Sequence, residues 1–381
     1  MLTKNIVFKN FMNTKISLKV KENLKNLLKE DNQVIESLKQ SYKNRYNFKK
    51  IIKLKKHLNI RIIGIGGSIL GAKAIYNFLS IKKKIYFIDN LKSRYDLKKK
   101  RYLNLVISKS GNTLETITNA SILLSKRDKN IFLTENRKSY LYSLAESLKS
   151  EVIHHNNYIG GRYSVLSEVG MLPAELMGLK PKKFRQLNNL IKNKRFMDNL
   201  VSNVSSILGY VKNKKYNSII INYNSNFNNL LEWYKQLVSE SLGKKGQGIL
   251  PIISNMPKDN HSTMQLYLGG FKKNFFTFFF SKDRRSNRIN NKKFLDSNLF
   301  LKNKTVNQIL YSQKFATERV FLKKNIPFRS FELNKLDEKT LGELFCFFIL
   351  ETILLGKSLN LNPYNQPAVE LIKKETKKLL I

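Results

Sequence analysis

A carboxylate and an imidazole that lie close together in the sequence are the side chains best suited to proton transfer. Glu240 belongs to the segment Gln236-Leu-Val-Ser-Glu-Ser-Leu-Gly-Lys244, and His261 follows shortly afterwards in Asn260-His261-Ser262. A carboxylate can take a proton from one carbon and return it to the next. A histidine can move a proton between oxygens near neutral pH. The pair indicates proton-transfer chemistry that needs neither a cofactor nor a metal.

A glycine-rich turn, Gly64-Ile-Gly-Gly-Ser-Ile-Leu-Gly71, follows an apolar segment that we predict to be a strand. Its glycines would let the backbone approach an anion at the amino terminus of a helix. Two other interpretations stay open. The turn could bind a nicotinamide cofactor with Asp89 on the ribose, although the spacing is not G-x-G-x-x-G. The glycines could also serve only the packing of a helix on a strand.

A second turn, Ser108-Lys-Ser-Gly-Asn-Thr-Leu-Glu-Thr116, carries four hydroxyl groups and a glycine between an apolar strand and a helix. Side-chain donors and backbone amides could converge there on a phosphate, whose charge the helix dipole favours. The absence of a Walker lysine pattern favours a phosphate monoester over a nucleoside triphosphate. Alternatively, Asn112 and Glu115 could simply begin the helix.

A third turn places Arg162 directly after the paired glycines Gly160 and Gly161. A guanidinium group is well suited to holding an oxyanion in a fixed geometry. Together with the carboxylate, the imidazole and the hydroxyl-rich turn, this arginine favours the isomerisation of a sugar phosphate.

Apolar segments, polar turns and amphipathic segments alternate along the chain, which is typical of α/β proteins with parallel sheets. The pattern predicts strands over 61–65, 85–88, 103–107, 129–133, 218–223 and 275–280. It predicts helices over about 17–48, 70–79, 113–124, 227–242, 340–355 and 368–380. The first two turns then lie at the carboxyl ends of strands, where ligands bind in open α/β sheets.

The length of 381 residues suits two domains that each bury a core. We expect an amino-terminal helical segment over 1–48 and a first α/β domain over 49–180. A helical connector over 181–203 then leads to a second α/β domain over 204–358. A carboxy-terminal helix over 359–381 would complete the active site.

Cysteine content and hydropathy indicate the cellular setting. The single cysteine, Cys346, excludes an internal disulfide framework and favours a reducing compartment. The amino terminus does not resemble a signal peptide. The most apolar run, 345–355, contains Glu351 and is too short to cross a bilayer. We therefore expect a cytoplasmic protein that does not associate with membranes.

The net charge of +43 and the pI near 10.1 are typical of proteins that bind nucleic acids. The basic residues, however, are mostly lysines spread along the whole chain among many Asn, Ile, Phe and Tyr residues, as an A+T-rich coding sequence would produce. The longest basic run, 98–101, lies in no recognisable nucleic-acid-binding motif. A nucleic-acid partner is therefore the less favoured interpretation, and the charge would instead attract phosphorylated substrates.

Six motifs in the same order resemble those of the glucose-6-phosphate isomerase family, also called the phosphoglucose isomerase family. They are GIGGSILG at 64–71, SKSGNTLETITNA at 108–120, GGRYSVLSEVGMLPAEL at 160–176, QLVSESLGK at 236–244, DNHSTMQLYLGG at 259–270 and NPYNQPAVELIKK at 362–374. The resemblance implies two flavodoxin-like sugar-isomerase domains with parallel central sheets flanked by helices. It also implies a homodimer whose active sites lie at the interface.

The resemblance also implies roles for individual residues in interconverting glucose 6-phosphate and fructose 6-phosphate. Glu240 would be the base that forms a cis-enediol, and Arg162 would stabilise the enediolate. His261, supplied by the partner subunit, and Lys373 would open the sugar ring. The substrate would be bound by Gly67, Ser68, Ser108, Lys109, Ser110, Thr113, Gln236 and Gln366, with Glu115 holding the site together.

Several alternatives stay open. The enzyme could also accept mannose 6-phosphate, or the scaffold could be a non-catalytic sensor of sugar phosphates or a regulator that binds nucleic acid. The adjacent His154 and His155 lack a Cys or Glu partner at a usable spacing, so we predict a structural role for them and no metal site. Ile372 stands before Lys373, where many members of the family have glycine, and could alter the approach of this helix to the sugar.

Overall fold

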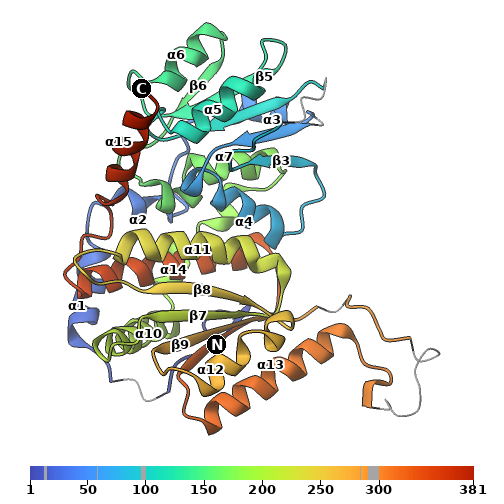
Figure 1. The fold of residues 1–381 in the computed structure, drawn as a ribbon, viewed down its shortest axis with the longest axis vertical. Helices are drawn as coiled ribbons and strands as arrows, with labels where there is room; N and C mark the ends of the chain where they lie inside the picture. The colour runs from blue at the N-terminus through green and yellow to red at the C-terminus, as the bar shows by residue number, and fades with distance from the viewer. Residues whose placement is uncertain (13–14, 58, 96–99, 284, 291–299) are drawn as a thin grey trace.

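A computed structural model describes the chain except for residues 13–14, 58, 96–99, 284 and 291–299, so residues 98 and 99 of the longest basic run lie outside the described residues. The described residues form two five-stranded sheets. Figure 1 shows one sheet above the other, with helices α11 (Asn228–Leu242) and α14 (Glu338–Ser358) running between them. The predicted α/β architecture is therefore confirmed.

The first sheet is entirely parallel, in the order β3-β2-β4-β5-β6. Its strands are β2 (Ile60–Ile63), β3 (Ile85–Ile88), β4 (Leu103–Ile107), β5 (Lys129–Thr134) and β6 (Glu151–His154). All residues of β2 and β4 are buried, as expected for parallel strands that are covered on both faces. The order matches that of the flavodoxin-like sheet, in which the strand order reverses between the first and third strands.

The helices of this half include α3 (Phe48–Leu54), α4 (Leu70–Phe78), α5 (Leu114–Leu123), α6 (Tyr140–Ser147) and α7 (Glu168–Leu176). Helix α4 packs against α11, and its small residues Ala72 and Ala74 are buried. Helices from the two halves therefore contact each other directly.

The second sheet repeats the same strand order, β8-β7-β9-β10, and adds β1 in the fifth position. Its strands are β7 (Asn217–Asn222), β8 (Leu250–Asn255), β9 (Asn274–Ser281), β10 (Phe328–Leu333) and β1 (Ile6–Lys9). The amino-terminal β1 pairs antiparallel with β10, whereas the other pairs are parallel. Aromatic side chains fill the core around β9, where Phe279 stacks on Phe331 with ring centroids 5.0 Å apart.

The remaining helices are α1 (Leu18–Leu27), α2 (Gln33–Ser37), α8 (Pro181–Phe184), α9 (Leu187–Leu190), α10 (Lys194–Lys212), α12 (Met264–Gly269), α13 (Val306–Lys323) and α15 (Val369–Leu379).

Arg329 of β10 and Glu351 of α14 form a buried ion pair. Both side chains also form hydrogen bonds with Asn203 of α10, which holds this helix in place. Removing one member of such a pair would cost about 3–5 kcal/mol, because the other charge would stay buried without a partner.

All predicted strands are present within a residue or two of their expected bounds, but β1, β6, β8 and β10 were not predicted. These strands are short or interrupted by polar residues and proline, as in Leu250-Pro-Ile-Ile-Ser-Asn255, so their apolar pattern is weak. The expected helix over 17–48 is divided into α1 and α2, with the start of α3 at its end. The expected division into domains remains a proposal.

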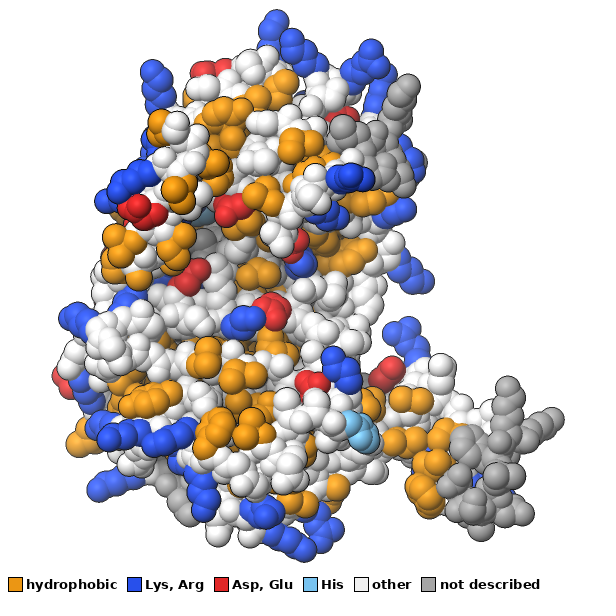
Figure 2. Space-filling model, in the orientation of Figure 1, with side chains coloured by type: hydrophobic (Ala, Val, Ile, Leu, Met, Phe, Trp, Pro, Cys, Tyr) orange, Lys and Arg blue, Asp and Glu red, His pale blue; other side chains and the backbone are white. Residues whose placement is uncertain are grey.

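Figure 2 shows Lys and Arg side chains scattered over the visible face of the molecule. Among the helices that the structure describes, none combines the length and the hydrophobicity required to cross a membrane.

Candidate active site

The glycine-rich turn and the hydroxyl-rich turn follow β2 and β4, the two central strands between which the order of the first sheet reverses. The glycine-rich turn contains a short 3-10 helix, η1 (Gly66–Ser68), and Gly66 has a φ of +54°. A Cβ atom on Gly67 would lie 2.1 Å from the carbonyl carbon of Gly161. Glycine is therefore required where this turn packs against the turn of Arg162.

The hydroxyl-rich turn folds back on itself, because the hydroxyl groups of Ser108 and Thr113 lie 2.9 Å apart. Thr113 precedes α5 without a side-chain capping bond, and the side chain of Asn112 instead accepts the backbone N–H of Tyr140 at 2.9 Å. Capping by Asn112, the alternative explanation of this turn, is therefore wrong. The first amides of α5 stay available for an anion.

The other predicted members of this turn are oriented by neighbouring groups. Lys109 donates to the carbonyl of Asn157 at 2.7 Å and lies 3.5 Å from a carboxylate oxygen of Glu135. The hydroxyl of Ser110 accepts the N–H of Asn112 at 3.2 Å. Glu115 lies half-buried in the first turn of α5.

Glu240 lies in the last turn of α11 and is reached by two site residues. Gln236, one turn earlier, donates its side-chain amide to one carboxylate oxygen at 2.7 Å. Arg162 donates to the other oxygen at 3.3 Å. The amide nitrogen of Gln236 would lie 2.7 Å from a Cβ on Gly66, so the glycine-rich turn is in contact with the helix that carries Glu240. The Glu240 side chain is 26% exposed, which leaves room for a ligand.

Arg162 belongs to a 3-10 helix, η2 (Gly161–Leu166), and is buried. All five of its N–H groups have acceptors. They donate to Ser241, Glu240, Gln366 and the carbonyl oxygens of Pro363 and Asn365, at 2.6–3.3 Å. The guanidinium therefore joins η2, α11 and a segment near the carboxyl terminus, residues 361–367, which we call the C-terminal strap.

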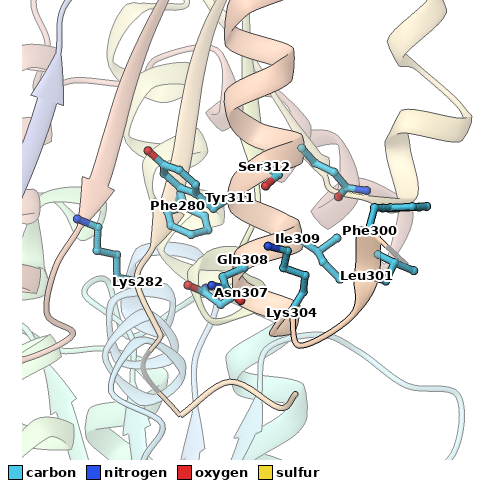
Figure 3. A pocket seen from close by; sticks show the side chains of 11 residues that line it. Phe280, Lys282, Phe300, Leu301, Lys304, Asn307, Gln308, Ile309, Tyr311 and Ser312 are labelled. Carbon is cyan, nitrogen blue, oxygen red and sulfur yellow. The ribbon is translucent and has the colours of Figure 1, made fainter. Parts of the chain in front are cut away.

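A cavity of about 810 Å³ lies between the end of α11 and the C-terminal strap, and it is lined by Glu240 and Gln366. A second cavity, of about 550 Å³, is drawn in Figure 3. Phe280 of β9 and Tyr311 of α13 contribute to its wall, and no predicted site residue is among the described residues that line it. The cavity at Glu240 is therefore the candidate active site.

His261 lies outside this cavity, exposed in a 3-10 helix, η4 (Lys258–His261), that follows β8. Because β7 and β8 are parallel, η4 lies at the end of the sheet where α11 begins. Glu240 lies near the other end of α11, about 18 Å further along the helix axis at 1.5 Å per residue. The structure does not bring His261 and Glu240 of one chain together.

Lys373 lies on α15, which begins at the rim of the cavity. Its side chain is 61% exposed and pairs with Glu370 of the same helix at 2.6 Å. The preceding Ile372 is 70% exposed. The helix therefore presents Lys373 to solvent, one turn beyond the residues that line the cavity.

A family model described as "Phosphoglucose isomerase" matches residues 9–380 of the chain. The chain belongs to the phosphoglucose isomerase family. The glucose-6-phosphate isomerase of Methanocaldococcus jannaschii is 34% identical over 86% of this chain and 86% of its own length. That of Mycoplasmopsis pulmonis is 32% identical over 84% of this chain and 82% of its own length. The crystal structure of a glucose-6-phosphate isomerase from Chlamydia trachomatis shares the fold, with a TM-score of 0.76, 16% identity and coverage of 99% of this chain and 89% of that one.

Two residues of this candidate site were not predicted. Ser241 accepts the Nε–H of Arg162 at 2.8 Å, and its hydroxyl lies 2.8 Å from that of Tyr163. Tyr163 also donates to the carbonyl of Pro363 at 3.0 Å. Their positions directly after Glu240 and Arg162 in the sequence were the signal that could have identified them.

Other polar groups in this member of the family have structural partners. Asp89 pairs with Lys73 of α4. His155 is buried, and its Nδ1 lies 2.8 Å from the carbonyl oxygen of Asn156. Burial lowers the pKa of His155 to about 4, so the ring stays neutral near pH 7. Within the described ranges, no cluster of His, Cys, Asp and Glu side chains is suited to holding a metal ion.

Proposed function

We propose that this chain catalyses the reversible isomerisation of glucose 6-phosphate and fructose 6-phosphate through a cis-enediol intermediate. The observation that carries this proposal is the position of Glu240 at a cavity, in contact with Gln236 and Arg162 and close to the glycine-rich turn. Membership of the phosphoglucose isomerase family and the relatives named glucose-6-phosphate isomerase support the substrate pair.

Glu240 would take the proton from carbon 2 of the open-chain sugar and return it to carbon 1. This transfer needs a carboxylate that exchanges its proton slowly with bulk water, and the partial burial of Glu240 favours that. The electron pair that the C–H bond leaves forms the enediolate, whose negative charge builds up on oxygen. Nη1 of Arg162 donates to both Glu240 and Gln366, and we propose that it exchanges its longer contact, to Glu240, for the enediolate oxygen.

The phosphate would bind at the hydroxyl-rich turn. Backbone amides at the start of α5 and the hydroxyl groups of Ser108, Ser110 and Thr113 supply donors there. Gly67 and Ser68 would contact the sugar from the neighbouring turn, and Gln236 and Gln366 would contact it as well.

Ring opening would use Lys373 and the His261 of a second copy of the chain. Because His261 is exposed at the opposite end of α11 from Glu240, we propose a homodimer in which each copy supplies a histidine to the other's cavity. Movement of α15 toward the cavity would bring Lys373 to the sugar.

The reaction as proposed uses no cofactor and no metal. We also propose a cytoplasmic location for the protein.

A coupled assay that detects glucose 6-phosphate formed from fructose 6-phosphate tests the function. We expect turnover by the purified protein and its loss in Glu240→Gln. A parallel assay with mannose 6-phosphate tests whether the substrate choice is broader. Binding of fructose 6-phosphate without turnover would instead favour a non-catalytic sensor.

A further inference from the structure

The C-terminal strap is held beside Glu240 by two cations from different parts of the chain. Arg162 donates to the carbonyl oxygens of Pro363 and Asn365 at 2.7 and 3.0 Å. Lys244, which follows α11, donates its ammonium group to the carbonyl oxygen of Asn362. These contacts reach the backbone of the strap, so they fix its path whatever its side chains do.

The backbone of Lys244 is itself fixed close to Glu240. Its N–H donates to the carbonyl of Gln247 at 3.0 Å, and the N–H of Gln247 donates back at 2.9 Å. The two residues between them, Lys245 and Gly246, have φ angles of +52° and +69°, the combination of a type I′ turn. This tight turn begins where α11 ends. The backbone position from which the Lys244 side chain extends is therefore fixed relative to Glu240.

The position of the strap determines the geometry around the carboxylate. Gln366, within the strap, accepts a hydrogen bond at 2.6 Å from Nη1 of Arg162. The same nitrogen donates to Glu240 at 3.3 Å. A displacement of the strap by about 1 Å would alter both contacts, and displacements of that size reduce catalytic rates strongly.

We propose that Lys244 is a positioning residue of the isomerisation, which clamps the strap at Asn362 so that Gln366 and Arg162 keep their geometry at Glu240. This role rests on the proposed function and adds to it a residue outside the predicted catalytic and substrate-binding set. Lys244 lines the same cavity as Glu240, so its charge also faces the space in which the substrate would bind.

The electrostatic surroundings make the clamp sensitive to pH. Burial and the positive charge of Arg162 lower the pKa of Lys244 to about 8, against the opposing effect of Glu240. Arg162 on η2 and Glu240 on α11 are the charged groups that act on Lys244, and the strap contains one titratable side chain, Tyr364. A protonated ammonium group donates a stronger hydrogen bond than a neutral amine. The clamp should therefore weaken as the pH rises through this pKa.

The test compares Lys244→Met and Lys244→Arg with Lys245→Met, which removes a charge from the neighbouring residue of the same cavity wall. With fructose 6-phosphate as substrate, we expect Lys244→Met to lower kcat about tenfold while KM changes less than about threefold. Lys244→Arg should keep most of kcat and move its alkaline decline to higher pH, because an arginine stays protonated. Lys245→Met should lower kcat less than Lys244→Met does.

Three kinetic outcomes would overturn the role of Lys244. They are a wild-type kcat in Lys244→Met, equal losses in the Lys244 and Lys245 variants, and a KM raised about tenfold or more at unchanged kcat. The last pattern would mean that Lys244 binds the substrate anion directly.

Hydrogen exchange of the peptide that contains residues 361–367 separates this proposal from the proposed function, because it needs no turnover. We expect faster exchange in Lys244→Met than in the wild type and in Lys245→Met. Unchanged exchange would overturn the clamp whatever the activity. A wild-type protein that turns over no fructose 6-phosphate would instead overturn the proposed function.

Discussion

The two sheets have the same strand order at their centres, but the turns at their switch points carry different chemistry. In the first sheet, the turns after β2 and β4 are rich in glycine and hydroxyl groups. In the second sheet, side chains at and just after the carboxyl ends of β7 and β9 bind one another. Asn224 donates to Ser281 at 2.6 Å, and Asn222 donates to Asn228 and Asn255.

The fold supplies two equivalent positions, and we expect the turns to decide which of them binds a ligand. Polar side chains that satisfy one another leave few donors for a phosphate. The second half contributes to the site differently, through α11, which packs against α4 and carries Glu240 to the first half.

Glu240→Gln tests whether the second half supplies the catalytic base. An amide has nearly the same shape but cannot accept the proton, so we expect kcat to fall by about 10³-fold or more. Affinity for fructose 6-phosphate should stay within about tenfold, or 1.4 kcal/mol, as measured by calorimetry. Glu232→Gln, on the same helix but paired with Lys235 at 2.9 Å, is the matched control and should keep full activity. Near-normal activity of the Glu240 variant would refute the assignment of the base.

Arg162→Ala removes the residue that connects the first half to both α11 and the strap. We expect kcat to fall on the order of 10²–10³-fold, more than the substrate affinity, because the enediolate loses its donor. The variant should also lose about 2–3 kcal/mol of unfolding free energy, since the buried Pro363 carbonyl and Ser241 hydroxyl each lose one of their two hydrogen-bond partners. Steady-state kinetics and urea denaturation measure the two effects. A loss of affinity with an unchanged kcat would make Arg162 an anchor for the substrate only.

His261→Asn tests the proposed exchange of residues between two copies of the chain. We expect kcat for the cyclic sugar to fall by about 10²-fold, because ring opening loses its acid–base group. Mixing this variant with Glu240→Gln should restore part of the activity, since a mixed dimer has one cavity with both residues intact. Each variant mixed with itself is the control. Absence of recovery, despite subunit exchange demonstrated by mass spectrometry, would contradict a shared site.

Paired substitutions at the two switch points test the comparison most directly and have the smallest expected effect. Ser110→Ala with Thr113→Ala should raise KM for fructose 6-phosphate about tenfold, because hydrogen bonds to a charged group are lost. Asn224→Ala with Ser281→Ala, at the second switch point, should change KM less than about twofold. Equal effects of the two pairs would remove the distinction between the sheets.

Much of the fold was predictable because buried parallel strands are continuous apolar runs. Segments such as Leu103–Ile107 and Asn274–Ser281 are recognisable without any neighbours. The strand β1 was not, because its four residues become a strand only by pairing with β10, more than three hundred positions later. The buried Arg329 of β10 likewise gains its carboxylate partner, Glu351, only once α14 lies beside it.

The sequence by itself determined the types of group available for chemistry, the turns that carry them and the strands that precede those turns, because all of these depend on neighbouring residues. The tertiary structure decided which groups meet. It brought Arg162, Glu240 and Gln366 together from three separate segments, through hydrogen bonds whose donors and acceptors lie far apart in the chain. It also left His261 and Lys373 outside the cavity of their own chain, because η4 lies at the opposite end of α11 and α15 is exposed to solvent.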